Sequence, residues 1–225
     1  MTAAVVLVHG FASSFDREWV QPGWVALLED MGRSVIGIDL LGHGQAAKPH
    51  DPSAYDAVED DVVATLPADG PVDAIGFSMG ARVLLTLASR TPERFGRIVV
   101  GGVGGRLLDG QDDGQGQAIA DGVDGKESDD PLAQAFGRFA RTPGNDPEAL
   151  AAFIRRRHVQ LTADDLGRIT APVLVVAGDR DPLAGDPAAL AAVLPKGEAK
   201  LLRKVDHLAT ASDFGFIDAA LSFLG

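Results

Sequence analysis

A serine stands where an apolar run of the sequence gives way to a helix-like pattern. The segment Gly76–Phe77–Ser78–Met79–Gly80 has the spacing glycine-x-serine-x-glycine, and it overlaps the end of the β-forming run 72–77. A serine at such a junction lies on a sharp turn, and the two glycines let strand and helix approach without a Cβ clash. The first N–H groups of the helix then point at the hydroxyl and favour negative charge there. The chain has 27 glycines, so the letters alone can arise by chance and the prediction depends on this context.

Other apolar runs end in residues that would complete a site for a nucleophilic serine. A serine hydroxyl reacts poorly until an imidazole takes its proton, and the imidazole needs a carboxylate on its other nitrogen. Strand ends at one edge of a parallel sheet bring such groups together. Run 3–8 leads into His9, Gly10 and Phe11, and run 34–39 ends at Asp39, before a turn around His43. Run 172–177 leads into Asp179 and Asp181, and run 199–205 leads into Asp206 and His207. The order along the chain is serine, acid, histidine.

On these residues the chain resembles the serine hydrolases of the α/β-hydrolase superfamily. The resemblance rests on the His9–Gly10–Phe11 loop, the Gly76–Gly80 segment and the Asp39–Gly44 turn, and it covers nearly the whole length. It implies Ser78 as nucleophile, His207 as general base, and an aspartate after the penultimate strand as the group that orients the base. The family spacing glycine-x-x-aspartate favours Asp181 over Asp179.

The resemblance also implies an oxyanion hole built from backbone N–H groups. Those of Phe11 and Met79 are the expected donors. The residues expected to order or line the site are His9, Gly10, Gly76, Phe77 and Gly80. No metal and no organic cofactor is implied, and the expected partner is a small-molecule acyl substrate. The glycines at 101–105 follow a strand, but they do not fit the dinucleotide-binding spacing.

Each of these polar side chains also has a structural interpretation. His207 could be a surface histidine at a strand end, and His9 is expected to order the loop rather than to react. His43 would hold a loop conformation, and Asp39 would form a turn. Asp206 is a poor candidate for the orienting acid, because the side chains of adjacent residues point apart.

The expected reaction is cleavage of a small ester, thioester or lactone through an acyl-enzyme on Ser78. Related enzymes use the same triad for perhydrolysis with peroxide or for cleavage of carbon–carbon bonds next to ketones, and the sequence leaves these alternatives open. A ligand receptor that keeps the fold without turnover is an alternative of another class. Epoxide hydrolases and haloalkane dehalogenases are excluded, because they need an aspartate at the position of Ser78.

Composition is that of one α/β domain spanning residues 1–225. The chain is 46% hydrophobic, which suits a sizeable core. Its net charge of −12 disfavours nucleic acid and anionic membranes as partners. It has no cysteine, so disulfides and thiol chemistry are excluded. Neither a secretory signal nor an apolar run of membrane-spanning length is recognisable, so a cytoplasmic location is expected.

Short β-rich runs alternate with helix-like segments, which predicts a doubly wound, mostly parallel sheet. The family usually has an antiparallel hairpin before its first parallel strand, and this chain begins at that strand, so six strands are expected. Strands are predicted at 4–8, 34–39, 72–77, 97–100, 173–177 and 199–202, and helices at 22–30, 53–66, 79–90, 186–194 and 212–223.

An insertion at 101–170 corresponds to the segment where the family builds its lid. Its first half is rich in glycine and acidic residues, from Gly101 through Gly110 and Gly114 to Asp130, and this predicts a mobile loop. Its second half predicts helices at 131–140 and 147–159. The arginines 155–157 are expected to form a solvated helix face, with an anion-binding role as the less favoured alternative. His50 and His158 are expected to be solvated.

Overall fold

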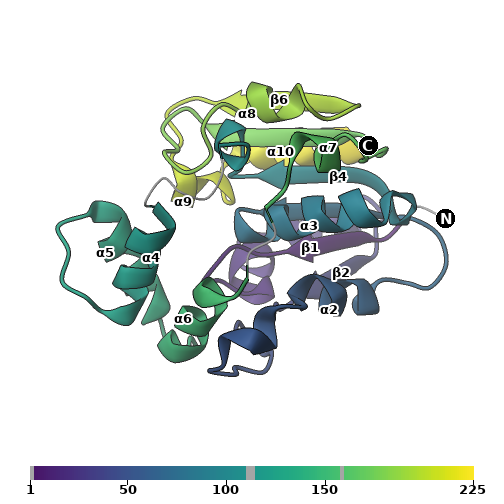
Figure 1. Cartoon of the computed structure of the whole chain (residues 1–225). Coiled ribbons are helices and arrows are strands. Elements are labelled where there is room, and N and C mark those ends of the chain that lie inside the picture. The colour runs from purple at the N-terminus through teal and green to yellow at the C-terminus, as the bar shows by residue number, and fades with distance from the viewer. Residues whose placement is uncertain (1–2, 110–114, 158–159) are drawn as a thin grey trace.

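Six parallel strands form a single sheet at the centre of the molecule (Figure 1). The computed structural model describes residues 3–109, 115–157 and 160–225. The sheet order is β2-β1-β3-β4-β5-β6, and every neighbouring pair is parallel. The strands are β1 (Val5–Val8), β2 (Val35–Ile38), β3 (Val72–Phe77), β4 (Phe95–Gly101), β5 (Val173–Gly178) and β6 (Gly197–Leu202). The prediction of a six-stranded parallel sheet is confirmed.

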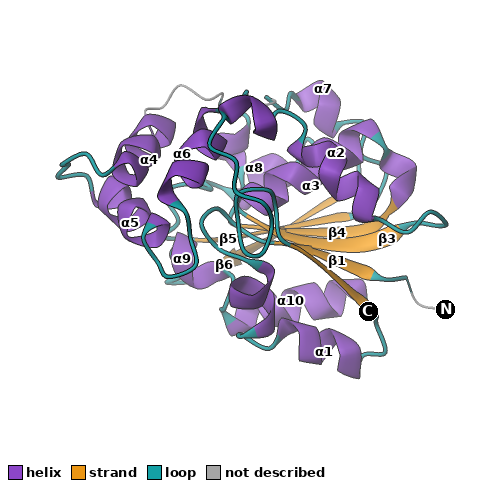
Figure 2. Cartoon of the chain, turned by 90° about the horizontal axis from the view of Figure 1, so that it is seen from below, coloured by secondary structure: helices purple, strands orange, loops and turns teal. Residues whose placement is uncertain are grey.

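Helices cover both faces of the sheet, because successive strand residues point to opposite sides. Val6 and Val8 of β1 pack in one core with α2 (Val58–Thr65), α3 (Met79–Arg90), α7 (Ala163–Leu166) and α8 (Pro187–Ala191). Val5 and Leu7 pack in the other core, with α1 (Trp24–Asp30) and α10 (Phe214–Leu224). Figure 2 shows α1 and α10 on one side of the strands and α2 and α3 on the other. With both faces covered, β3 and β5 are buried along their whole length.

The helix boundaries follow local capping signals. α5 (Pro131–Ala140), α6 (Pro147–Arg155) and α8 each begin at an Asp-Pro pair whose aspartate accepts hydrogen bonds from amides of the first turn. The helix predicted at 22–30 begins at Trp24, because Gly23 adopts a left-handed φ of 94°. The helix predicted at 53–66 is divided into η2 (Pro52–Tyr55) and α2. The remaining short elements are η1 (Asp16–Val20), η3 (Pro92–Arg94), η4 (Gly105–Leu107) and α9 (His207–Thr210). No helix in the described ranges is both long and apolar enough to cross a bilayer.

The segment 101–170, which the sequence predicted to be an insertion, is more helical in its described residues than expected. Residues 115–124, expected in a mobile loop, form α4 (Gln115–Asp124), which packs on α5 and α6 (Figure 1). A Cβ on Gly122 would lie 1.9 Å from the carbonyl oxygen of Ala133, and one on Gly137 would lie 2.7 Å from that of Gly122. These glycines therefore allow a close crossing of two helices, a purpose that composition does not distinguish from flexibility. Gly110, Gly114 and His158 lie outside the described residues, and the helix predicted at 147–159 ends at Arg155.

Candidate active site

Ser78 lies on the sharp turn between β3 and α3 that its flanking glycines predicted. Its φ of 50° and ψ of −109° are unusual for a residue with a side chain, and its N–H donates to the carbonyl of Gly101 at 2.8 Å. A Cβ on Gly80 would lie 2.2 Å from the carbonyl oxygen of Val8, and one on Gly76 would lie 2.8 Å from the amide nitrogen of Ala81. Only glycine fits at both positions, so α3 can begin directly against the end of β1.

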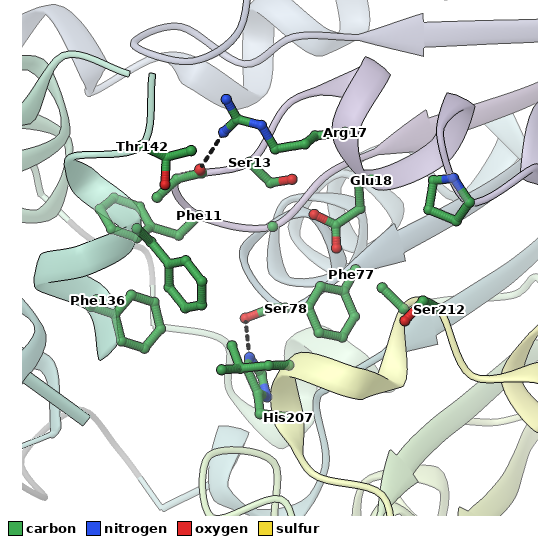
Figure 3. Close-up of a pocket in the computed structure, with 16 residues that line it drawn as sticks. Phe11, Ser13, Arg17, Glu18, Phe77, Ser78, Phe136, Thr142, His207 and Ser212 are labelled. Atoms are coloured by element: carbon green, nitrogen blue, oxygen red, sulfur yellow. Dashed lines mark hydrogen bonds between the residues drawn. The ribbon is translucent and has the colours of Figure 1, made fainter. Parts of the chain in front are cut away.

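His207 and Asp181 form a chain of hydrogen bonds with Ser78. His207 Nε2 lies 3.0 Å from Ser78 Oγ (Figure 3), and His207 Nδ1 lies 2.8 Å from Asp181 Oδ2. A carboxylate accepts only, so Nδ1 carries the proton and Nε2 presents its lone pair to the serine hydroxyl. The second carboxylate oxygen of Asp181 accepts the amide protons of Leu183 at 2.8 Å and Ala184 at 3.0 Å. The buried carboxylate is therefore held from both oxygens.

The neighbouring acids have other partners. Asp179 accepts a hydrogen bond from the amide of Lys204 at 2.6 Å. Asp206 caps α9 by accepting from the amide of Ala209 at 2.9 Å. The structure thus brings Asp181 to the imidazole of His207 and gives Asp179 and Asp206 structural contacts.

The loop after β1 is ordered by His9. This buried histidine lies with Nδ1 2.8 Å from the carbonyl of Gly10, and its Nε2 accepts the amide proton of Leu40 at 3.1 Å. Burial is the main cause that lowers the pKa of His9, which favours the neutral ring that this pair of bonds requires. Ala12, in the same loop, has a left-handed φ of 59°. Strained backbone of this kind is found at sites where function needs it.

Among the described residues, the two amides expected to form an oxyanion hole have no competing acceptor. In the described ranges the Phe11 amide donates no hydrogen bond, and the Met79 amide belongs to the first turn of α3, where amides lack an intrahelical acceptor. Phe11 and Ser78 line the same cavity, which has a volume of about 380 Å³. The Phe77 ring, which also lines it, lies against the His207 ring with centroids 5.1 Å apart.

Other polar residues noted in the sequence lie away from the hydroxyl. Asp39 accepts the amide protons of Phe15 and Gln45, both at 2.7 Å, as a turn-forming residue does. His43 is buried against Phe11 and Phe153, and burial lowers its pKa well below the usual value. His50 is exposed beside Asp146 at 2.9 Å.

The arginines of 155–157 do not share one environment. Arg155 and Arg157 are exposed, as predicted. Arg156 is half-buried, with its guanidinium 3.7 Å from the centroid of the Phe153 ring, so the prediction of a solvated face is wrong at this position. Desolvation lowers the pKa of Arg156 to about 10. The ring of Phe153, one turn away on α6, provides a surface that a charge pattern alone does not reveal.

Known proteins resemble this chain in both sequence and fold. A family model described as alpha/beta hydrolase fold matches residues 3–153. The chain belongs to the α/β-hydrolase fold family. Two curated relatives are a mouse sn-1-specific diacylglycerol lipase, 34% identical over 43% of this chain, and 3-oxoadipate enol-lactonase 2 of Acinetobacter baylyi, 30% identical over 66% of it. The chain spans 31% of the length of the first and 62% of the second. Among solved structures, a bromoperoxidase from Bacillus anthracis is 22% identical with a TM-score of 0.78, over 100% of this chain and 92% of that one.

The cavity of this α/β hydrolase also contains residues that the sequence analysis did not single out. Arg17 and Glu18 of η1, Thr142 of the insertion and Ser212 after α9 all line it. For Arg17 and Glu18, the sequence signal was their position within ten residues of His9. This signal is weak, because a short charged segment is usually solvated. No group of three or more potential metal ligands occurs in the part of the chain that the structure describes.

Proposed function

We propose that this α/β hydrolase is a serine hydrolase that cleaves a small ester, thioester or lactone through an acyl-enzyme on Ser78. The observation that carries the proposal is the chain of hydrogen bonds from Ser78 Oγ through the His207 ring to Asp181, at 3.0 and 2.8 Å. The hydroxyl opens into a cavity large enough for a small acyl compound. In this proposal Ser78, His207 and Asp181 form a catalytic triad.

The first half of the reaction transfers the acyl group to the enzyme. His207 Nε2 takes the proton from Ser78 Oγ as the oxygen attacks the acyl carbon, and Asp181 stabilises the imidazolium. The amides of Phe11 and Met79 hold the oxyanion of the tetrahedral intermediate. His207 then gives its proton to the leaving alcohol, thiol or lactone oxygen as the bond to the acyl carbon breaks.

The second half releases the acid. A water molecule gives a proton to His207 Nε2 and attacks the acyl carbon, and the oxyanion returns to the same two amides. Collapse of this intermediate frees Ser78 Oγ, which recovers its proton from His207. Every step uses groups of this chain and water.

Labelling with a fluorophosphonate tests the proposal, because this reagent modifies serines that an imidazole activates. We expect label on Ser78 in the native protein, none in Ser78→Ala, and a loss of ester turnover in that variant of at least about a thousandfold. Ser89→Ala is the matched control: Ser89 lies at the other end of α3 and donates to the carbonyl of Thr86. Native protein that takes no label, or a Ser78→Ala variant with full turnover, would contradict the proposal.

The alternatives are distinguishable by experiment: perhydrolysis and cleavage of carbon–carbon bonds next to ketones by the substrates that are turned over, and a receptor by the absence of repeated turnover. The likeness to a bromoperoxidase motivates assays with peroxide and short carboxylic acids, in which perhydrolysis would exceed hydrolysis. A receptor would instead retain its ligand tightly and convert at most about one molecule of it per protein molecule, slowly.

A further inference from the structure

The cavity above Ser78 has two chemically different ends. Figure 3 shows Phe11 and Phe136 on one side of the Ser78 hydroxyl, and Glu18 and Ser212 on the other. The first end is aromatic, because the rings of Phe11 and Phe136 pack together there with centroids 5.9 Å apart. Phe136 comes from α5. The second end presents a carboxyl group and hydroxyls. A bound substrate would therefore meet apolar surface at one end and hydrogen-bond acceptors at the other.

The Glu18 side chain is directed into the cavity by its position on η1. The next residue, Trp19, is fully buried and packs edge-on against Trp24 with ring centroids 5.3 Å apart. Because Trp19 is fixed in the core, the orientation of the short helix is fixed as well. The carboxyl of Glu18 lies near the hydroxyl of Ser13 and the backbone of Gly10, within electrostatic range of His207. Burial raises its pKa, and these three neighbours oppose the rise.

Glu18 has no cationic partner among the described residues. The adjacent Arg17 uses its guanidinium elsewhere, donating to the carbonyls of Ala12 at 3.4 Å and Pro143 at 2.8 Å. No ion pair to Glu18 is formed in the described ranges. Glu18 is half-buried in the wall of the cavity. A carboxylate that is partly removed from water without a counter-ion is destabilised, and a cation that arrives with a ligand offsets that cost. The net charge of −12 also favours the approach of cations.

We propose that the Ser13, Glu18 and Ser212 end of the cavity binds a positively charged ammonium group of the substrate. This proposal rests on the proposed function and deepens it: the preferred substrates are esters with an ammonium group a few bonds from the scissile carbonyl. The aromatic end, with Phe11, Phe136 and Phe139, accepts the uncharged half of the same substrate. Glu18 is then a specificity-determining residue, and its carboxylate pairs with the ammonium group when substrate is bound.

Two matched pairs of esters test the proposal, because either half of the ester can occupy the polar end. One pair is choline butyrate and its analogue with a tert-butyl group in place of trimethylammonium. The other is the nitrophenyl ester of trimethylammonio-butyrate and its tert-butyl analogue. We expect the charged member of at least one pair to have a kcat/KM about tenfold higher, from one ion pair between the Glu18 carboxylate and the trimethylammonium group. In Glu18→Gln and in Glu18→Met the ratio within that pair falls to about one.

Asp16→Asn is the matched control. It removes the same charge from the same short helix, and Asp16 is exposed and does not line the cavity. We expect this variant to keep the preference of the native protein. An equal loss of preference in Asp16→Asn would overturn the proposal, because overall charge would then be the cause.

Other results also overturn the proposal, and they are distinguishable from failure of the proposed function. Equal kcat/KM within both pairs, in native protein that takes the fluorophosphonate on Ser78 and hydrolyses the neutral esters, refutes the ammonium site alone. If neither Glu18 variant takes the label, Glu18 holds the Gly10–Ser13 loop instead of a ligand, and the proposal fails. Native protein without label or turnover refutes the hydrolase proposal itself.

Discussion

Replacing Asp181 by asparagine tests how the geometry around His207 determines the protonation of its ring. One carboxylate oxygen of Asp181 accepts the amides of Leu183 and Ala184, and the other faces His207 Nδ1 at 2.8 Å. An asparagine keeps its single oxygen on the two amides, so its NH2 group faces the ring. Nδ1 must then accept, and Nε2 carries a proton toward Ser78 Oγ. In that tautomer His207 cannot take the serine proton.

The expected loss follows from this tautomer change. When the orienting aspartate of a serine hydrolase becomes asparagine, kcat falls by about 10⁴-fold. That loss corresponds to an increase of about 5 kcal/mol in the activation free energy. The two backbone amides keep an acceptor, so we expect the free energy of unfolding to change by less than about 1 kcal/mol. Initial rates with nitrophenyl butyrate and urea unfolding measure the two quantities separately.

Asp179→Asn is the control for this prediction. Asp179 lies two residues away and accepts from the Lys204 amide, without contact to His207. An asparagine oxygen can accept the same bond, so we expect a change in kcat of less than about threefold, which is under 1 kcal/mol. Comparable losses in both variants, or a loss of less than tenfold in Asp181→Asn, would refute the tautomer argument.

Two further predictions concern stability. Gly122→Ala should lower the free energy of unfolding by about 1–3 kcal/mol in urea titrations, because the added Cβ would lie 1.9 Å from the backbone of α5. Gly116 lies in the same helix, and a Cβ there would meet no atom within 4 Å. Gly116→Ala is therefore the control, and it should be neutral or stabilising by up to about 1 kcal/mol. If the two variants respond alike, the close crossing is not what these glycines serve. Burial holds the pKa of His43 well below 6.5, so the folded protein keeps this ring neutral at a pH where the unfolded chain binds a proton. The contribution of the neutral ring to the free energy of unfolding is therefore complete above the unfolded pKa of about 6.5, and it is lost as the pH falls below that value. His43→Phe should therefore flatten the acid side of the stability profile, and an unchanged slope would contradict this.

Much of the fold was predictable from the sequence because its signals are local. The runs that became β3 and β5 are continuous and apolar, as strands buried on both faces must be. Asp-Pro pairs begin three of the helices by satisfying their own first amides. The insertion was predicted less well, since Gly122 and Gly137 serve contacts between helices and their purpose depends on which surface lies opposite.

The sequence by itself determined the Ser78 turn, because glycine spacing and a change from strand to helix act within a few residues. Only the tertiary structure decided which groups face that hydroxyl. The amides of Asp179 and Arg180 bond to the carbonyls of Leu202 and Val205, and this pairing of two distant loops carries His207 to Asp181. The position of Glu18 in the cavity also depends on distant residues, because the neighbouring Trp19 is anchored in a core formed by residues far along the chain. Local patterns specify backbone conformation, whereas the meeting of side chains depends on packing between segments that no short window contains.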